Sequence, residues 1–342
     1  MGAKLVLAIS KPIINCHRNV IKHNLFFVNK CGNKIGGKPA AYSYFSPVKF
    51  AAVDIGSNAI RLLISRVMPT ENLDIQFKKV EFIRIPLRLG DDVFSTGKIS
   101  KEKQELFLMT MNAFKLILDV HGVKEYMACA TSAMREAKNG AALVAKVQKK
   151  FNFKVDIISG DKESELILKS VMSSFPSKGN YVNIDVGGGS TEITVIKDHE
   201  VACAKSFPIG SVRTKEGKVN PKVWTEMELW VKQNSNIENK TIAVGTGGNI
   251  NKLYNMADKG QKKAVSLDTL EKLYKEIRPM SISDRIYKLK LNPDRADVID
   301  HAASIYIAVM EWAGIKQIYS PNAGLKDGMI MELWDIHKNI VR

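Results

Sequence analysis

Residues 182–192 read VNIDVGGGSTE: an apolar strand ends at Asp185, three glycines and a Ser-Thr pair follow, and the chain resumes with Glu192. A similar stretch, VDIGSNAIR, occupies residues 53–61. Each stretch places an Asp at the end of a strand, then a turn of small residues before a second strand, which is the pattern of a β-hairpin. Asp54 and Asp185 are 131 positions apart, and this repeat predicts two similar domains.

The charge that follows each Asp differs between the two hairpins. Seven positions on, the first has Arg61 and the second has Glu192, so one offers a cation and the other a second carboxylate. Carboxylates beside a bound phosphate repel it unless a divalent cation lies between them, and Mg²⁺ prefers one or two carboxylates together with waters and phosphate oxygens. Asp185 and Glu192 therefore suit a magnesium ion.

A third glycine-rich turn lies within AVGTGGNINKL (243–253), between an expected strand and an expected helix. Glycines let the backbone approach a ligand closely and direct its N–H groups at phosphate oxygens, and a helix start also attracts anions. Three such turns favour a phosphate-binding site over the alternative, in which the glycines only turn hairpins and the acids are solvated.

The order of the remaining elements predicts an α/β fold. SKEKQELFLMTMNAFKLILDVHG (100–122) begins at a Ser cap, repeats apolar residues at helical spacing and ends at Gly122. An expected strand (125–130), a turn at TSAMRE (131–136), a helix near 138–150 and a strand at 154–159 follow. Strands that alternate with helices are typical of α/β proteins.

Composition narrows the function classes. With 342 residues, 45% of them hydrophobic and 25% charged, the chain is expected to be a globular protein with room for two domains. No apolar run approaches the roughly 20 residues of a membrane span, so no membrane association is expected. Fifty-one Lys and Arg against 35 Asp and Glu give a net charge of +16, which favours polyanionic partners. No nucleic-acid motif is present, and the four cysteines, which lack CxxC spacing, indicate a reduced, cytoplasmic protein.

The first 48 residues differ from the rest. They contain seven Lys or Arg and no Asp or Glu. They show no apolar periodicity, and they precede the first expected strand. We therefore expect a basic leader at 1–48 that is disordered or not native, although its composition also resembles a transit peptide.

Seven segments occur between about residues 50 and 340. In chain order they are DIGSNAIRLLI, CATSAMREAKNG, IISGDKESELI, NIDVGGGSTEITV, SFPIGSVR, AVGTGGNINKL and RADVID. Together they resemble the motifs of the exopolyphosphatase/guanosine pentaphosphate phosphohydrolase family. The resemblance implies the actin/Hsp70/sugar-kinase superfold, in which two ribonuclease-H-like domains flank an active-site cleft. It predicts a first domain at 49–165, joined by a C-terminal helix at about 326–340, and a second at 166–325. It also implies the short, two-domain form of the family and a homodimer.

The resemblance also implies a role for each matching residue. Glu163 takes the position of the proposed general base, which activates water. The metal-associated carboxylates correspond to Asp54, Asp185 and Glu192. The phosphate-binding residues correspond to Gly56, Ser57, Asn58, Arg61, Arg135, Gly187, Gly188, Gly189, Ser190, Thr191, Gly247 and Gly248.

The reaction implied is Mg²⁺-dependent release of terminal orthophosphate from inorganic polyphosphate. Hydrolysis of guanosine pentaphosphate and a catalytically weak polyphosphate- or alarmone-binding regulator are the alternatives. Six basic residues near the motifs are candidates for a polyphosphate track: Arg61, Arg135, Lys162, Lys205, Arg213 and Lys252.

Three positions depart from the family pattern: Ser132, Lys162 and Glu165 stand where many members have Asn, Glu and Arg. A lysine next to Glu163 is expected to favour the ionised form of that carboxyl group.

Overall fold

In the computed structural model, the described residues are 48–69, 75–172, 179–198, 200–235, 241–258 and 264–341. The leader expected at 1–48 lies almost entirely outside this range. Residues from Pro47 onward form one compact unit, to which all statements below refer. In the described residues, no helix is both long and apolar enough to cross a membrane.

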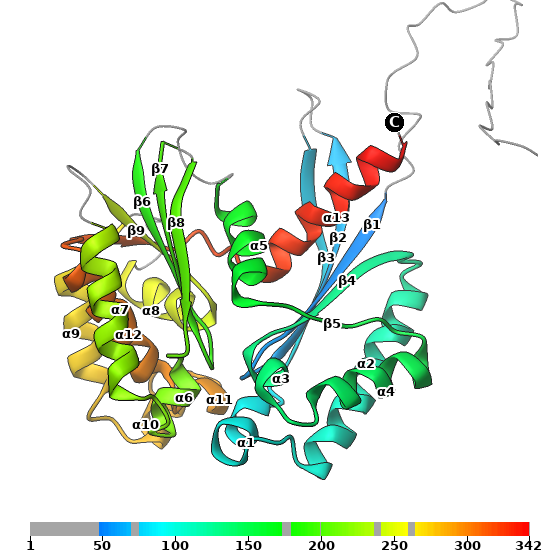
Figure 1. The fold of residues 1–342 in the computed structure, drawn as a ribbon, viewed down its shortest axis with the longest axis horizontal. Helices are drawn as coiled ribbons and strands as arrows, with labels where there is room; N and C mark the ends of the chain where they lie inside the picture. The colour runs from blue at the N-terminus through cyan, green and yellow to red at the C-terminus, as the bar shows by residue number, and fades with distance from the viewer. Residues whose placement is uncertain are drawn as a thin grey trace, which may run out of the picture. The chain divides into compact units, whose positions relative to one another are not determined.

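Two β-sheets organise this unit (Figure 1). The first sheet has the strand order β3-β2-β1-β4-β5 and the second has the order β10-β11-β9-β6-β7-β8. The strands of the first are β1 (Lys49–Ile55), β2 (Ile60–Pro69), β3 (Ile75–Ile85), β4 (Glu125–Ala130) and β5 (Asp156–Ile157). The strands of the second are β6 (Asn180–Val186), β7 (Thr191–Lys197), β8 (Glu200–Phe207), β9 (Ile242–Thr246), β10 (Val265–Ser266) and β11 (Gln317–Tyr319).

The two sheets repeat one arrangement, which confirms both expected hairpins. β1 pairs antiparallel with β2 and parallel with β4, and β6 pairs antiparallel with β7 and parallel with β9. Asp54 lies opposite Arg61 in the first hairpin, and Asp185 lies opposite Glu192 in the second. The charges seven positions after each Asp are therefore direct cross-strand neighbours.

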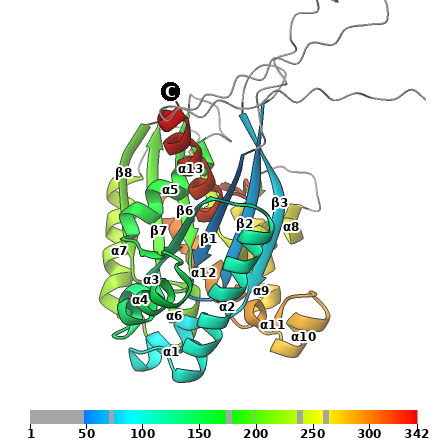
Figure 2. The ribbon, with the colours of Figure 1, turned by 90° about the vertical axis from the view of Figure 1, so that its right-hand side faces the viewer.

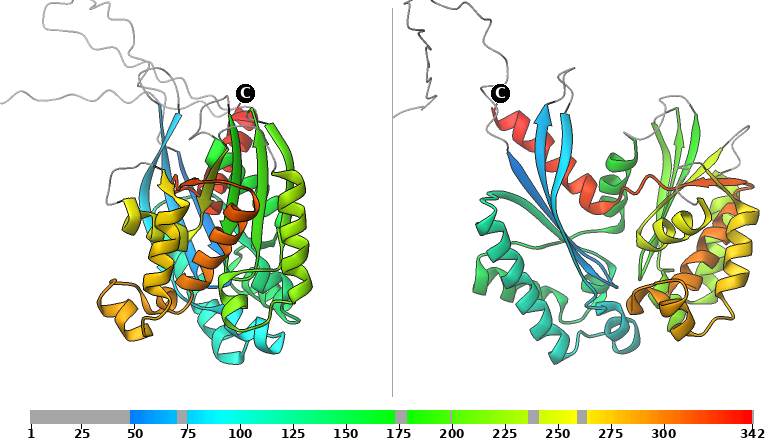
Figure 3. Two further views of the ribbon diagram at one scale, coloured as in Figure 1. Left: turned by 90° about the vertical axis from the view of Figure 1, so that its left-hand side faces the viewer. Right: turned by 180° about the vertical axis from the view of Figure 1, so that it is seen from behind.

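Most helices lie on the outer sides of the two sheets, whereas α5 (Gly160–Met172) and α13 (Leu325–Val341) lie between the sheets (Figures 1 and 3). Those after the first hairpin are α1 (Leu89–Thr96), α2 (Lys101–Val120), α3 (Ser132–Glu136), α4 (Gly140–Phe151) and α5 (Gly160–Met172). Those after the second hairpin are α6 (Ser211–Lys215), α7 (Pro221–Asn234), α8 (Gly248–Asp258), α9 (Leu267–Ile277), α10 (Ile282–Tyr287), α11 (Pro293–Ala296), α12 (Ile299–Trp312) and α13 (Leu325–Val341).

The helix predicted at 100–122 is α2, and its start is correct. The Ser100 hydroxyl accepts the Lys103 N–H, and the helix ends two residues before Gly122, whose φ is +65°. The stretch predicted as a turn at 131–136 instead forms the short helix α3, and the strand predicted at 154–159 is reduced to two residues. Local propensity identifies these segments, but tertiary packing decides their exact lengths.

Helices α5 and α13 lie against each other and share a hydrophobic core with both sheets, including Phe50, Leu166, Val244 and Met329. Their backbones approach closely at Gly328. A Cβ at this position would fall well inside van der Waals contact of the Leu166 carbonyl oxygen. Since α13 also packs on β1, β2 and β4, it connects the chain end to the first sheet. The domain bounds expected from sequence stay predictions.

Candidate functional site

A cavity of about 670 Å³ opens between the two sheets; we call it the main cavity. Twelve of the sixteen residues assigned to the site from sequence line it, from all three glycine-rich loops and from α5. They are Asp54, Gly56, Ser57, Asn58, Arg61, Glu163, Asp185, Gly187, Gly188, Ser190, Gly247 and Gly248. The topology brings them together because both hairpin turns lie at facing ends of the sheets.

The first hairpin turn contributes an ion pair. Arg61 Nη1 lies 2.6 Å from Asp54 Oδ2, and Asp54 is buried. The turn is closed by a hydrogen bond of 3.2 Å from the Gly56 N–H to the Ala59 carbonyl oxygen. The carboxylate of Asp54 is therefore neutralised within its own hairpin.

The second hairpin turn has no such neutralisation. Asp185 Oδ1 accepts a hydrogen bond from the Thr246 hydroxyl at 2.5 Å, and Glu192 Oε1 accepts one from the Ser206 hydroxyl at 2.7 Å. Burial, followed by the charge of Asp185, raises the pKa of Glu192 to about 7. Burial also raises the pKa of Asp185. Two adjacent buried carboxyl groups thus oppose each other's ionisation.

Glu163 lies in the first turn of α5 and lines the main cavity. Burial, followed by the charges of Glu192, Asp185 and Asp54, raises its pKa well above the ordinary value. Its Oε2 atom is buried and accepts no hydrogen bond, and the nearest cation is Arg135, whose Nη1 lies 3.9 Å from that oxygen.

The expectation that Lys162 favours the ionised form of Glu163 is wrong. The Lys162 ammonium group bonds Glu165 Oε1 at 2.7 Å and lies 3.8 Å from Glu332 Oε1, on the outer side of α5. Consecutive residues of a helix point in different directions, so adjacency in sequence does not bring the two charges together.

The four acids Asp54, Glu163, Asp185 and Glu192, which we call the carboxylate cluster, fit a divalent cation. Glu163 Oε2 and Glu192 Oε2 are both buried without hydrogen bonds, and burial, followed by the charges of neighbouring carboxylates, raises the pKa values of both groups. Among the described residues no three His, Cys, Asp or Glu side chains are close enough to enclose an ion by themselves. A divalent cation bound here would therefore take fewer than three of these carboxylates and complete its coordination with water or substrate oxygens.

The raised pKa values predict how stability depends on pH when metal is withheld. Folded Glu192 binds its proton more tightly than the unfolded chain does, so its stabilising contribution is complete below about pH 4.5 and is lost as the pH rises through about 7. In EDTA we expect the Tm to fall by roughly 5 °C between about pH 5 and about pH 8. Addition of Mg²⁺ at the higher pH should reverse this fall.

Thermal unfolding of Glu192→Gln, compared with a variant at the exposed Glu165, Glu165→Gln, separates this effect from the general charge of the protein. Only the first substitution should flatten the profile. Equal slopes in both variants would contradict the assignment.

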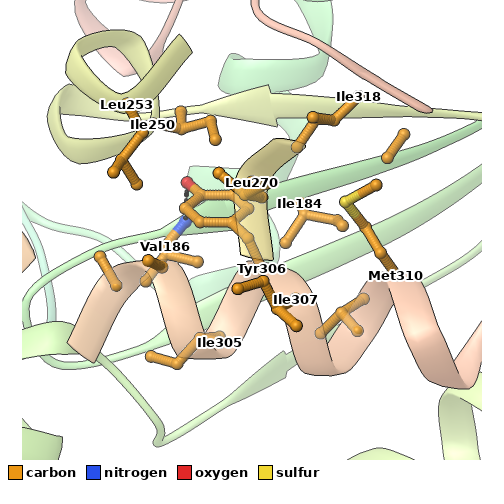
Figure 4. Packing of buried hydrophobic residues seen from close by; sticks show 14 of the residues in the cluster. Ile184, Val186, Ile250, Leu253, Leu270, Ile305, Tyr306, Ile307, Met310 and Ile318 are labelled. Atoms are coloured by element: carbon orange, nitrogen blue, oxygen red, sulfur yellow. Dashed lines mark hydrogen bonds between the residues drawn. The ribbon is translucent and has the colours of Figure 1, made fainter. Parts of the chain in front are cut away.

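One tyrosine fixes the second and third loops to each other. Tyr306, from α12, is fully buried, and its hydroxyl accepts the Val186 N–H at 3.1 Å (Figure 4). The same hydroxyl donates to the Thr246 carbonyl oxygen. Gly247, next to Thr246, has a φ of +103°, and a Cβ there would lie 3.3 Å from Asp185 Oδ1. The tyrosine therefore sets the spacing between Asp185 and the start of α8.

Removal of this hydroxyl should weaken both the fold and the site. Tyr306→Phe leaves a buried N–H and a buried carbonyl oxygen without a partner, which typically costs about 1–3 kcal/mol. We expect a lower Tm and a higher metal concentration for half-maximal activity, measured by thermal unfolding and by metal titration. Tyr287→Phe, at an exposed residue, is the matched control; an equal effect of both variants would argue against the bridge.

The loops of the two sheets touch beside the cavity. Ser57 Oγ lies 2.8 Å from Ser132 Oγ, and a Cβ at Gly188 would come within 2.8 Å of Ser57 Cβ. The backbone N–H groups of Ser57 and Gly188 donate to no other described residue. They are therefore available to a ligand.

Four residues predicted from sequence do not line the main cavity. Glu192 lies behind it against Ser206, and the Thr191 hydroxyl donates to the Ile209 carbonyl oxygen. Gly189 is packed against Phe94 and Ser132. Arg135 donates to the Ile158 carbonyl oxygen at 2.6 Å and lines a smaller opening next to the carboxylate cluster.

Most of the basic residues that we expected to form a polyphosphate track do not line the main cavity. Of the six candidates, only Arg61 and Lys252 line it. Lys205 pairs with Glu226, and Arg213 pairs with Glu136 and donates to the Gly189 carbonyl oxygen. Both cations are thus engaged in ion pairs away from the main cavity.

Other cations, missed from sequence, line the cavity instead: Lys79, Arg84, Arg295 and Lys326. Arg295 is mostly buried, and burial followed by the charge of Arg84 lowers its pKa. We call Arg61, Arg84 and Arg295 the arginine cluster. The sequence could have pointed to Arg295, because it lies in the RADVID segment. Arg84 lies in no such motif.

Comparison with known proteins identifies the family of this chain. The family model described as the Ppx/GppA phosphatase family matches residues 70–337. Exopolyphosphatase 1 of Mycobacterium leprae is 27% identical over 313 residues, which cover 84% of this chain and 90% of the relative. The guanosine-5'-triphosphate,3'-diphosphate pyrophosphatase of Vibrio cholerae is 23% identical, over 83% of this chain and 59% of the relative.

A bifunctional 3-dehydroquinate synthase/phosphatase of Fusobacterium nucleatum is 35% identical over 197 residues, which cover 54% of this chain and 30% of that relative. The chain therefore spans less than two thirds of the length of two of these relatives. Among solved structures, an exopolyphosphatase from Cytophaga hutchinsonii superimposes with a TM-score of 0.73 at 23% identity, over 84% of this chain and 98% of that one. This likeness shows the fold, and the family match over residues 70–337 shows that the chain belongs to the Ppx/GppA phosphatase family.

Proposed function

We propose that the protein is a phosphoanhydride hydrolase that releases terminal orthophosphate from inorganic polyphosphate with the help of Mg²⁺. The observation that carries this proposal is the charge arrangement of the main cavity. The arginine cluster lines it together with three acids of the carboxylate cluster, Asp54, Glu163 and Asp185. Glu163 presents a buried oxygen without a hydrogen bond. Such a site suits a polyanion whose reacting end is placed beside a carboxylate base.

The arginines bind and orient the phosphate chain. Arg61 is held by Asp54, and Arg84 is held by Asp294, so both guanidinium groups are positioned before substrate arrives. Planar guanidinium groups bond phosphate oxygens in pairs, which fixes the orientation of the chain. The unshared N–H groups of Ser57 and Gly188 add donors at the cavity wall.

Glu163 accepts the proton of the attacking water at its free oxygen. A raised pKa suits this task, because a general base works best when its pKa lies near the working pH. Asp185 and Glu192, oriented by Thr246 and Ser206, would hold the cation. When bound, Mg²⁺ supplies positive charge that lets the carboxylates ionise and neutralises the phosphoryl oxygens.

Phosphate release from long-chain polyphosphate, with Mg²⁺ and with EDTA, tests the proposal directly. We expect metal-dependent release and a KM that rises with ionic strength, since salt screens the attraction between the cavity cations and the chain. Tight polyphosphate binding without release would instead identify a binding regulator. Release that EDTA leaves unchanged would contradict the metal assignment.

Guanosine pentaphosphate is a second candidate substrate, because the main cavity contains an exposed aromatic ring. Phe82 lines the main cavity with 42% of its surface exposed, and the Lys326 and Lys79 ammonium groups lie 5.9 and 6.0 Å from its ring centre. A purine can stack on such a ring while the lysines meet its phosphates. Phe82→Leu should then raise the KM for guanosine pentaphosphate and leave that for polyphosphate unchanged; equal effects on both substrates would remove the stacking role.

A further inference from the structure

A second, smaller cavity opens to solvent on the other side of the carboxylate cluster. Its volume is about 380 Å³, and its lining comes mainly from α3, the start of α5 and β8; we call it the α3–β8 opening. Figure 2 shows β8 and α3 on the left side of the molecule, whereas β3 and α8, which line the main cavity, lie on the right. The two cavities therefore reach the surface on opposite sides.

One layer of side chains separates the α3–β8 opening from the main cavity. Ser190 lines both cavities. Arg135 lines the opening, and its Nη1 atom lies 3.9 Å from Oε2 of Glu163, which lines the main cavity. Ser206 also lines the opening, and its hydroxyl donates to Glu192 Oε1 at 2.7 Å. We call Arg135, Ser190 and Ser206 the partition.

The direction of the proposed reaction places its product next to the partition. The attacking water gives its proton to Glu163, so it approaches the terminal phosphorus from the side of that residue. The water oxygen bonds to this phosphorus while the bridging P–O bond on the opposite side breaks, and the shortened chain keeps the bridging oxygen. Orthophosphate thus forms between Glu163 and the shortened chain. It can return through the main cavity only after the chain has left.

We propose that orthophosphate leaves through the α3–β8 opening while the shortened chain stays bound in the main cavity. This inference rests on the proposed function and makes hydrolysis processive, because the chain can advance without dissociating. Arg135 meets the product first, since its guanidinium group donates to the Ile158 carbonyl oxygen and keeps further N–H donors for a phosphate oxygen. Rotation of the Arg135 and Ser206 side chains then opens the partition.

The size and charge of the α3–β8 opening suit a passage. Its volume equals that of roughly a dozen water molecules at about 30 Å³ each, so a phosphate ion fits together with part of its hydration shell. Of the charged residues that line it, Lys205 and Glu136 are each paired with another side chain. The other two, Arg135 and the exposed Asp161, have opposite signs. A phosphate ion is therefore attracted without being held tightly, as release of a product requires.

Obstruction of the opening should slow release of phosphate and leave its formation unchanged. Ala204 is exposed on β8 and lines the opening, so Ala204→Trp places an indole ring across it. Ala202 is exposed on the same strand and lines neither cavity, which makes Ala202→Trp the matched control.

Rapid mixing with long-chain polyphosphate and Mg²⁺ separates the two steps, because acid quenching counts all phosphate formed and a phosphate-binding sensor counts only free phosphate. In Ala204→Trp we expect the quench to show a burst of about one phosphate per active site at the rate of the parent. The sensor should show no burst and a steady rate lowered at least roughly fivefold.

The lengths of the chains that remain during hydrolysis test the second part of the proposal. With polyphosphate in excess, the parent should degrade some chains completely while others stay intact. In Ala204→Trp the phosphate must wait for the chain to dissociate, so all chains should shorten together. Gel electrophoresis of samples taken during the reaction shows which pattern holds. A parent that shortens all chains together would overturn the proposal, whether or not the variant folds.

Failure of the exit route and failure of the proposed function give different results. If the quenched parent forms no phosphate from polyphosphate, the proposed function is wrong and the exit route is wrong with it. If the parent hydrolyses polyphosphate but the two tryptophan variants behave alike, or if Ala204→Trp slows the burst itself, only the exit route is wrong. A burst confined to Ala204→Trp, together with its loss of processivity, supports the exit route.

Discussion

Glu163→Gln is expected to lower the turnover number by about 10² to 10⁴ and to leave polyphosphate binding nearly unchanged. Glutamine keeps the shape of the side chain but cannot accept the proton of the attacking water. The same substitution removes a buried carboxyl group whose pKa the neighbouring acids raise. In EDTA near neutral pH, the free energy of unfolding of the variant should therefore exceed that of the parent. Substitution of an active-site residue often raises stability in this way.

Steady-state phosphate release gives the turnover number, and equilibrium binding of polyphosphate gives the affinity. Glu165→Gln is the matched control, because Glu165 lies two residues on in α5 and its side chain is 63% exposed. If Glu163→Gln retains the turnover of the parent, Glu163 is not the base, and the search for it would move to the other acids of the carboxylate cluster.

The second large effect is expected at the crossing of α5 and α13. Gly328→Ala places a methyl group against the Leu166 carbonyl oxygen, which belongs to the backbone of α5 and cannot move alone. Overpacking of this kind costs about 3 kcal/mol, so the Tm should fall by roughly 5 °C or more. Because Glu163 stands on α5, turnover should fall as well, by roughly tenfold, since displacement of a catalytic group by about 1 Å can cost that much or more.

Gly324→Ala provides the control for this prediction. Gly324 precedes α13, and a Cβ there would meet nothing within 4 Å. Thermal unfolding and phosphate release of the two variants should differ clearly. Unchanged stability in Gly328→Ala would mean that the two helices separate at little cost, and that their contact does not position Glu163.

Several parts of the fold could be predicted because they depend on short-range chemistry. A strand, a turn of tiny residues and a second strand specify a hairpin, and the repeat of this pattern led to two equivalent sheets. Ser100 marked the start of α2 because its side chain replaces a missing backbone partner. Glu163 was placed correctly in the first turn of α5 for a similar reason: the local pattern shows where a helix begins.

What could not be predicted depends on contacts between distant segments. Arg84 and Asp294 are 210 positions apart, and nothing around either residue indicates the pairing. Tyr306 looks like an ordinary core residue in sequence, and only the structure shows that its hydroxyl joins two loops. The environment of Lys162 was predicted wrongly because sequence adjacency does not give the direction of a helical side chain.

The twin hairpins have one more consequence, which concerns symmetry. Their backbones are equivalent, yet Asp54 with Arg61 carries no net charge, whereas Asp185 with Glu192 carries two negative charges when both are ionised. Glu192→Arg would give both hairpins the same neutral pair of side chains, and Arg61→Glu would give both the same acidic pair. In either case the two hairpins would no longer differ in charge. The duplicated scaffold thus owes the electrical difference between its two hairpins to one cross-strand position, which is basic in one copy and acidic in the other.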